Sequence, residues 1–215
     1  MKDINLFKTK DSIHLKKIKS KSGISKDEDY DGYLIESSES SKDDSGDPKE
    51  ARRIIQSLKG TGKKIGLVGG DDAFNRRVIE SLKIDFLVSP ERGDKKDGLK
   101  QRDSGLNHVV AKIASARNSV PSKLGTSGEV PVSSGKKGVA IVVDVSEISK
   151  LKGKEKALRL ERIIQNIKVC RKVGCDVKIA SLAGDKRGVV DEKGRKAIGV
   201  SLGMSSSQSA GAVVF

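Results

Sequence analysis

Three side chains in one stretch of the sequence have the chemistry to transfer protons. They are Glu91, Asp103 and His108, and such a set can act as general acid and base where a strand ends. The cations around it favour ionised carboxylates over an acid of raised pKa. The set has no nucleophile–base order, and two histidines cannot build a metal cluster. We therefore predict no catalytic or metal-binding residue. Asp103 and Ser104 are interpreted as helix caps, and His108 as a hydrogen-bond partner of nearby backbone.

A strand and a helix must position this stretch. The apolar run over 84–88 predicts a strand covered on both faces, and Pro90 ends it. Apolar residues then recur at helical spacing over 107–116, which predicts a helix. A basic loop therefore lies where the carboxyl end of a strand meets the start of a helix. Free N–H groups and the positive end of the helix dipole favour an anion such as phosphate at such a junction.

The residues of this junction also match a longer motif, in two parts. The first part is Leu87 with Ser89-Pro90-Glu91 and Gly93, and the second is the stretch 102–112, which reads Arg-Asp-Ser-Gly-Leu-Asn-His-Val-Val-Ala-Lys. An insertion over 94–101 separates the two. Further matching segments are Gly69-Gly70, Asn75-Arg76-Arg77, 138–144 and 160–183.

These segments resemble the p30 subunit of ribonuclease P in its archaeal form, also called protein component 3, over about 64–183. The resemblance implies a TIM-like barrel and a non-catalytic subunit of an endoribonuclease whose RNA removes the 5′ leader from precursor tRNA. The implied partners are the ribonuclease P RNA, a Pop5-like protein in a two-plus-two assembly, the other protein subunits and, indirectly, precursor tRNA. Mg²⁺ would serve the catalytic RNA, and no cofactor is expected in the chain itself. The sequence departs from the family at 189–194, where a Ser-Pro-Arg-Asp-like helix start is expected.

Under this resemblance, cations near the junction would neutralise RNA phosphates and release counterions. Two further arginines follow the strand expected over 64–68, and for these a solvated helix surface is an alternative interpretation. We predict RNA binding first by Arg92, Lys95, Lys96, Lys100, Arg102 and Lys112, and secondarily by Arg76 and Arg77.

Strand and helix patterns alternate along much of the chain, which predicts parallel pairing. About six or seven strands fall one or two short of an eight-fold barrel. We predict one α/β domain over 1–215, a TIM-barrel-like fold with an irregular N-terminal half; an open doubly wound parallel sheet is the alternative. Loops are expected over 36–46, 94–101 and 117–137. The main strands are expected over 4–7, 33–35, 64–68, 84–88, 139–145 and 175–182, and helices from Pro48 behind an Asp47 cap and over 155–173, with a short Ser-rich tail.

Composition agrees with a nucleic-acid partner. The chain has 43 Lys and Arg against 29 Asp and Glu, a formal charge of +14, and so strong a balance implies a polyanion. Aromatic residues make up only 3%, so recognition of backbone and shape is favoured over base stacking. Cys170 and Cys175 fit neither a redox pair nor a zinc site, and we expect buried or incidental thiols in a cytoplasmic protein. No run approaches 18 apolar residues, so no membrane partner is expected.

Two other functions remain open from the residues alone. A barrel enzyme acting on a phosphorylated small molecule would turn over its substrate without RNA. A ribosomal-type RNA-binding protein would suit the basic loops and the lean core that is expected of a chain in which only 35% of residues are hydrophobic.

Overall fold

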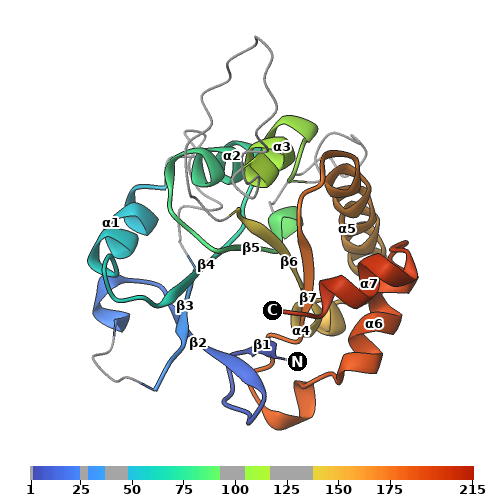
Figure 1. Cartoon of the computed structure of the whole chain (residues 1–215), viewed down its shortest axis with the longest axis horizontal. Helices are drawn as coiled ribbons and strands as arrows, with labels where there is room; N and C mark the ends of the chain where they lie inside the picture. Colours follow the sequence, from blue (N-terminus) through green and yellow to red (C-terminus); the bar gives the residue numbers. More distant parts are fainter. Residues whose placement is uncertain (1, 25–28, 37–47, 93–104, 117–137) are drawn as a thin grey trace, which may run out of the picture.

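A computed structural model describes residues 2–24, 29–36, 48–92, 105–116 and 138–215. Within these residues seven strands form one sheet, in which each strand pairs in parallel with the next strand of the chain. The strands stand in a ring with the helices outside it (Figure 1). They are β1 (Asp3–Asn5), β2 (Ser12–Ile18), β3 (Gly32–Ile35), β4 (Lys64–Val68), β5 (Phe86–Val88), β6 (Ala140–Asp144) and β7 (Val177–Ala180).

Two backbone hydrogen bonds join the first strand to the chain that follows the last. Leu182 N donates to Ile4 O at 2.9 Å, and Leu6 N donates to Ala183 O at 3.0 Å. Because the two ends of the sheet are bonded to each other, the sheet is a barrel. The TIM-barrel-like prediction is therefore confirmed, and the open doubly wound alternative is wrong.

The outer layer is regular only from β3 onward, as the sequence predicted. Lys21–Gly23, between β2 and β3, forms a 3-10 turn, η1, whereas the later strands are separated or followed by α-helices. Among the described residues, no helix is both long and apolar enough to span a membrane. The helices are α1 (Lys49–Ser57), α2 (Asp72–Ser81), α3 (His108–Ala116), α4 (Val145–Lys150), α5 (Gly153–Val173), α6 (Glu192–Ser201) and α7 (Ser206–Ala212).

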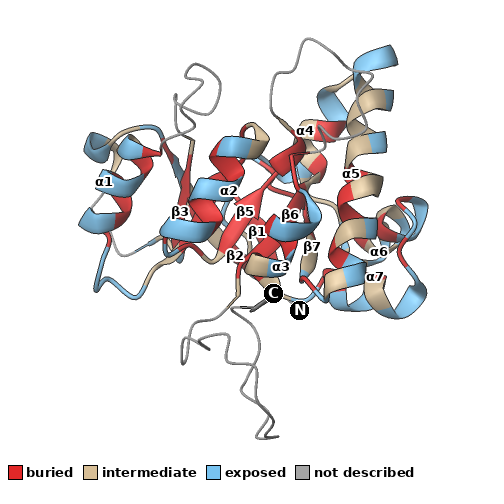
Figure 2. Ribbon diagram, turned by 90° about the horizontal axis from the view of Figure 1, so that it is seen from above, coloured by how far each residue is buried: buried red, intermediate tan, exposed pale blue. Residues whose placement is uncertain are grey.

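Side chains alternate between two hydrophobic layers along each strand, because neighbouring residues of a strand point to opposite faces. In β3, Leu34 lies in the barrel interior, while Tyr33 and Ile35 pack outward under the helices. The strands are accordingly buried through both faces, whereas the helices expose one side (Figure 2). At the amino ends of the strands the ring of Phe215 packs edge-on against Phe86, with 6.3 Å between ring centroids.

A buried ion pair lies at the seam between β1 and β7. Arg195 Nη1 of α6 is 3.0 Å from Asp3 Oδ1 of β1, and the two residues are only 3% and 5% exposed. The same carboxylate oxygen accepts hydrogen bonds from the backbone N of Ile4 and Ser181, at 2.8 and 3.2 Å. Arg195 Nη1 also donates to the carbonyl oxygens of Ile179 and Val213. One charge pair thus holds together the first strand, the last strand, α6 and the C-terminal segment.

Several element boundaries differ from the sequence prediction. Pro48 takes the N-cap position of α1 and not the first helical position, and Asp47 lies outside the described residues. Strand β7 ends at Ala180, and the residues after it bond to β1. The Ser-rich tail is in fact partly helical: α7 begins with a capping box, in which Ser205 and Gln208 each accept a backbone N–H of the other. Its short, small residues gave no apolar periodicity to detect.

Removing one member of the seam pair should strongly destabilise the barrel. Asp3→Ala leaves the Arg195 guanidinium buried without its counter-charge, a change that typically costs about 3–5 kcal/mol. Urea denaturation followed by circular dichroism would measure the loss. The exposed Asp11→Ala is the control, and an equal loss in both variants would contradict the assigned role of the seam pair.

Candidate nucleic-acid interface

The predicted junction lies at the carboxyl edge, the edge of the barrel at which the strands end. Strand β5 stops at Val88, and Ser89 turns the chain with a positive φ of 49°. Its backbone N donates to Val142 O of β6 at 2.9 Å, and its carbonyl accepts from Arg92 N at 3.1 Å. These bonds fold Pro90–Arg92 into a 3-10 turn, η3. The strained φ is retained because the surrounding bonds fix it.

Asn75 ties three loops of the carboxyl edge together. Its amide oxygen accepts from Gly70 N at 2.8 Å, and its amide nitrogen donates to the carbonyl oxygens of Gly70, Pro90 and Gly105, at 2.8–2.9 Å. The side chain is fully buried. One side chain of α2 therefore positions the loops that follow β4 and β5 and the approach to α3. The segments of the family resemblance included Asn75, but the sequence could not reveal this role. The role depends on three carbonyl groups that meet only in the folded chain.

Two glycines let the backbone come close to Pro90. A Cβ on Gly69 would lie 2.6 Å from Pro90 Cα, and one on Gly105, whose φ is +80°, would lie 1.7 Å from Pro90 O. No side chain fits at either position without moving the backbone. The glycines of the matched motif thus serve close packing of η3 between two loops.

Charged side chains form a chain of ion pairs across the carboxyl edge, which we call the edge network. Arg92 Nη1 is 2.7 Å from Glu36 Oε1, and Arg92 Nε is 3.2 Å from Glu147 Oε1. Arg159 of α5 lies 3.3 Å from Glu147 and 3.9 Å from Glu91. Although partial burial acts to raise it, hydrogen bonds from Arg92 and a lysine of β2 hold the pKa of Glu36 below its usual value. The network links η3 to β3, α4 and α5.

Glu91 contradicts the expectation that surrounding cations keep the carboxylates ionised. Its side chain is only 3% exposed, and burial raises its pKa to about 7, against the opposing charge of Arg159. The carboxylates of Glu147 and Asp144 raise it further. Asp144 caps α4 by accepting from Glu147 N at 3.0 Å, and burial raises its pKa to about 6. The expectation failed because desolvation outweighs the nearby positive charge at a fully buried site.

The structure brings some of the predicted RNA-binding residues together and separates others. Arg76, Arg77 and Lys112 are exposed on α2 and α3, which lie side by side (Figure 1). Arg76 also pairs with Glu80 at 2.8 Å. Arg92, by contrast, is 37% exposed and shared between two carboxylates of the edge network. Four of the predicted cations lie outside the described residues: Lys95, Lys96, Lys100 and Arg102.

The predicted cap of α3 was wrong. The side chain of Asn107 accepts from Val110 N at 3.0 Å, so Asn107 takes the cap position expected for Asp103 or Ser104. Those two residues lie outside the described part of the chain, and His108 is exposed in the first turn. Within the described residues no group of three or more His, Cys, Asp or Glu side chains is placed to hold a metal ion. Both cysteines are buried free thiols, as predicted.

Further cations at the carboxyl edge were missed. Lys150, Lys152 and Lys154 are exposed where α4 passes into α5, directly after β6. Lys186 and Arg187 are exposed in the 3-10 turn η4 after β7. The alternating lysines of Ser-Lys-Leu-Lys-Gly-Lys were visible in the sequence. Their position at the carboxyl edge could not be predicted, because it depends on the packing of α5 against η3. In that contact Arg162 donates to Glu91 O.

Comparisons with known proteins were made on both sequence and structure. No family model matches the chain. A ribonuclease P protein component 3 of Methanococcus vannielii is 26% identical over 145 residues, which cover 67% of this chain and 51% of that protein. The protein of the same name from Methanothermobacter thermautotrophicus is 35% identical over 78 residues, 36% of this chain and 29% of that protein. A chain in a cryo-EM structure of archaeal ribonuclease P with mature tRNA superposes with a TM-score of 0.56 at 21% identity, covering 82% of this chain and 63% of that chain.

The chain is therefore similar in sequence to ribonuclease P protein component 3 of several archaea. The family resemblance seen in the motif around Ser89 is thereby confirmed. The chain spans about half the length of the curated component 3 proteins that it matches first. The structural match, at its low identity, supports the barrel fold alone.

Replacing Asn75 should loosen the carboxyl edge as well as destabilise the protein. Asn75→Ala leaves several buried backbone groups without a partner, so we expect a loss of about 3 kcal/mol. Amide hydrogen exchange should accelerate at Gly70, whose N–H loses its acceptor. The neighbouring exposed Arg77→Ala is the control, and unchanged exchange at Gly70 in Asn75→Ala would contradict the positioning role.

Glu91 should make stability depend on pH in a direction opposite to that of an ordinary paired carboxylate. The unfolded chain ionises Glu91 near its usual value of 4.5, whereas the folded chain does so only at about 7. The free energy of unfolding should therefore fall as pH rises from about 4.5 to about 7, by up to about 3 kcal/mol. Glu91→Gln should flatten much of this slope in urea titrations, leaving the part due to Asp144. The exposed Glu161→Gln is the control. If Glu91→Gln keeps the wild-type pH profile, or if Glu161→Gln flattens the slope equally, the pKa of Glu91 is not the cause of the slope.

Proposed function

We propose that this chain is a protein subunit of ribonuclease P that binds and stabilises the RNA which removes the 5′ leader from precursor tRNA. The observation that carries the proposal is that seven curated relatives all bear the name ribonuclease P protein component 3. The fold match to a chain of archaeal ribonuclease P supports it.

The charge distribution suits this role. Exposed cations lie on α2, on α3 and at the α4–α5 connection, while Glu36, Glu91 and Glu147 are paired with arginines in the edge network. Lysines and arginines that meet RNA phosphates release bound counterions and lower the cost of compacting a folded RNA. The barrel then acts as a rigid scaffold that holds these charges at fixed spacing. Asn75 fixes the backbone segments that follow β4 and β5.

The RNA carries the chemistry in this proposal, with Mg²⁺ as the metal ion of the RNA. The partners are the ribonuclease P RNA, a Pop5-like subunit in a two-plus-two assembly and the other protein subunits, with precursor tRNA contacted through them. These assignments come from the family resemblance. The exposed cations of α2, α3 and the α4–α5 connection support the proposal that RNA contacts lie there.

One observation favours a second candidate, a barrel enzyme acting on a phosphorylated small molecule. Glu91 is a buried carboxyl group of raised pKa at the carboxyl edge, where barrel enzymes place their catalytic groups. Its burial beneath Arg159 argues against contact with a substrate. Turnover of a phosphorylated substrate by nuclease-treated protein, abolished in Glu91→Gln, would establish this candidate in place of the first.

Reconstituted ribonuclease P tests the RNA-binding surface. Neutral substitutions at Lys112, Lys152 and Lys186 should weaken processing of precursor tRNA and lower the salt dependence of RNA binding by about one unit per lost phosphate contact. Arg102→Gln tests a predicted cation outside the described residues. Lys172→Gln, at the far end of α5, is the matched control. Processing that stays at the wild-type rate at every salt concentration would remove these lysines from the interface.

A further inference from the structure

A pocket of about 370 Å³ opens at the amino end of the barrel, opposite the carboxyl edge. It lies between the last turns of α1 and α2 and the start of β4. We call it the basal pocket and define it by Arg52, Ile55, Leu58, Lys59, Lys63 and Lys83, which line it together with residues from the same segments. The RNA-binding role proposed above uses none of these residues.

The floor of the basal pocket is apolar. Ile55 and Leu58 of the first helix end, Ile65 of β4 and Leu82 of the second helix end all contribute to it. These side chains are nearly buried in the barrel and leave only their edges toward the pocket. Removing apolar surface from water lowers the free energy, so binding of an apolar side chain to this floor is favourable.

The rim of the basal pocket is positive. Lys59 and Lys83 are exposed, Arg52 and Lys63 add two more cations, and none of the described residues that line the pocket is Asp or Glu. Lys59 and Lys83 each follow a helix end, where a cation stabilises the helix dipole. That explains each lysine singly. It does not explain why these two exposed lysines flank one apolar hollow together with Arg52 and Lys63, which donate to Ser81 Oγ and Tyr30 O, while none of the described residues of the lining is acidic.

We propose that the basal pocket docks a protein partner through an acidic segment that carries an apolar side chain. Carboxylates of the segment meet the rim, and its apolar side chain fills the floor, so both halves of the pocket find a complement. RNA fits less well, because phosphates leave the apolar floor uncovered and, among the described residues, no aromatic ring lines the pocket for a base to stack on. The chain would then hold RNA at one end of the barrel and a protein at the other.

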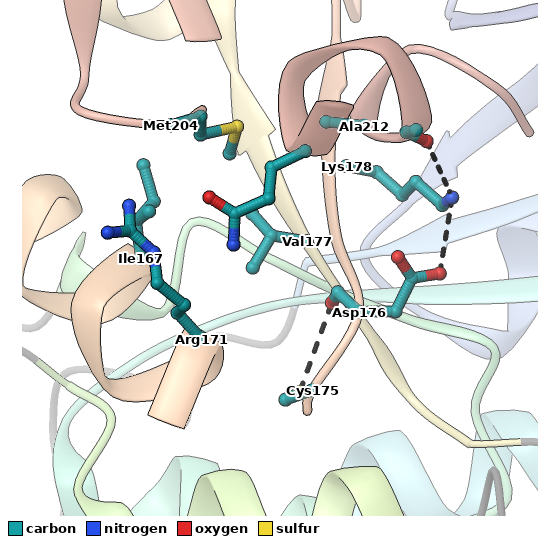
Figure 3. Close-up of a pocket in the computed structure, with 10 residues that line it drawn as sticks. Ile167, Arg171, Cys175, Asp176, Val177, Lys178, Met204 and Ala212 are labelled. Atoms are coloured by element: carbon teal, nitrogen blue, oxygen red, sulfur yellow. Dashed lines mark hydrogen bonds and ion pairs between the residues drawn. The ribbon is translucent and has the colours of Figure 1, made fainter. Parts of the chain in front are cut away.

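Another pocket, among the described residues, lacks this combination. It has a volume of about 260 Å³ and lies between α5, β7 and α7 (Figure 3). There Lys178 Nζ is 3.2 Å from Asp176 Oδ2 and 3.0 Å from Gly211 O, and Arg171 donates to Gly203 O. An acidic residue thus lies among the cations of this pocket and pairs with one of them, which is not the case among the described residues that line the basal pocket.

A short acidic probe tests the proposal on the whole chain. The probe is a fluorescein-labelled peptide, Glu-Glu-Leu-Phe-Glu-Glu, and fluorescence anisotropy measures its binding at low salt. We expect saturable binding that weakens about tenfold in the double variant Lys59→Glu with Lys83→Glu, since two attractive rim contacts become repulsive. A peptide with Ser in place of Leu and Phe should also bind less tightly. Lys168→Glu with Lys172→Glu is the matched charge control on α5, and it should bind like wild type.

Ser81→Phe gives a variant that fills the pocket without changing its charge, and it should reduce binding as well. Thermal melts check that each variant folds. The proposal is overturned if the peptide does not bind, if the α5 control weakens binding as much as the pocket variants do, or if Ser81→Phe binds like wild type. It is also overturned if oligouridylate of the same length displaces the peptide and loses its own binding in the Lys59 and Lys83 variant, because the pocket is then an RNA site. None of these outcomes depends on the RNA-binding role of the carboxyl edge.

Discussion

The barrel depends on one buried charge pair at its seam. A sheet of parallel strands closes only if its first and last strands meet, and here the first strand is three residues long. So short a strand gives few ladder hydrogen bonds, and Asp3 supplements them with contacts to Arg195 and to the backbone beyond β7. Burying a charge pair is costly unless both partners are held by further hydrogen bonds. The seam meets this condition through Ile4, Ile179 and Val213, so the pair also fixes the strand register that closes the ring.

The carboxyl edge is likewise held in place by a small number of polar contacts. Asn75 bonds to three backbone segments beyond the ends of β4 and β5, and Gly69 and Gly105 permit the close approach of these segments to Pro90. The edge network then joins η3 to both neighbouring sides of the barrel. As a result, buried hydrogen bonds and ion pairs fix the positions of the polar segments at the carboxyl edge.

The sequence predicted the parts of the structure that depend on local pattern. The strands near Val68, Val88 and Val142 and the long helix ending at Gly174 follow from runs and periodicity of apolar residues. The motif around Ser89 indicated a resemblance to the same proteins that the sequence comparison found. Closure of the barrel by Asp3 and Arg195, the raised pKa of Glu91 and the loop contacts of Asn75 could not be predicted, because each depends on residues that are distant in sequence and adjacent only in the folded chain. The helix α7 was missed for another reason: its Ser, Gly and Ala residues carry a cap signal without an apolar stripe.

The position of Arg92 has a consequence for how an RNA would meet this edge. Its guanidinium already contacts two carboxylates, so an arriving phosphate exchanges places with an acidic side chain in addition to displacing mobile ions. Such an exchange leaves Glu36 to its other partners Lys17 and Lys19, or Glu147 to Arg159; Glu36 directly follows β3, and Glu147 belongs to α4. RNA contact at this one arginine would therefore be felt in β3 and α4, and the protein would register its ligand through a rearranged set of ion pairs as well as through neutralised charge.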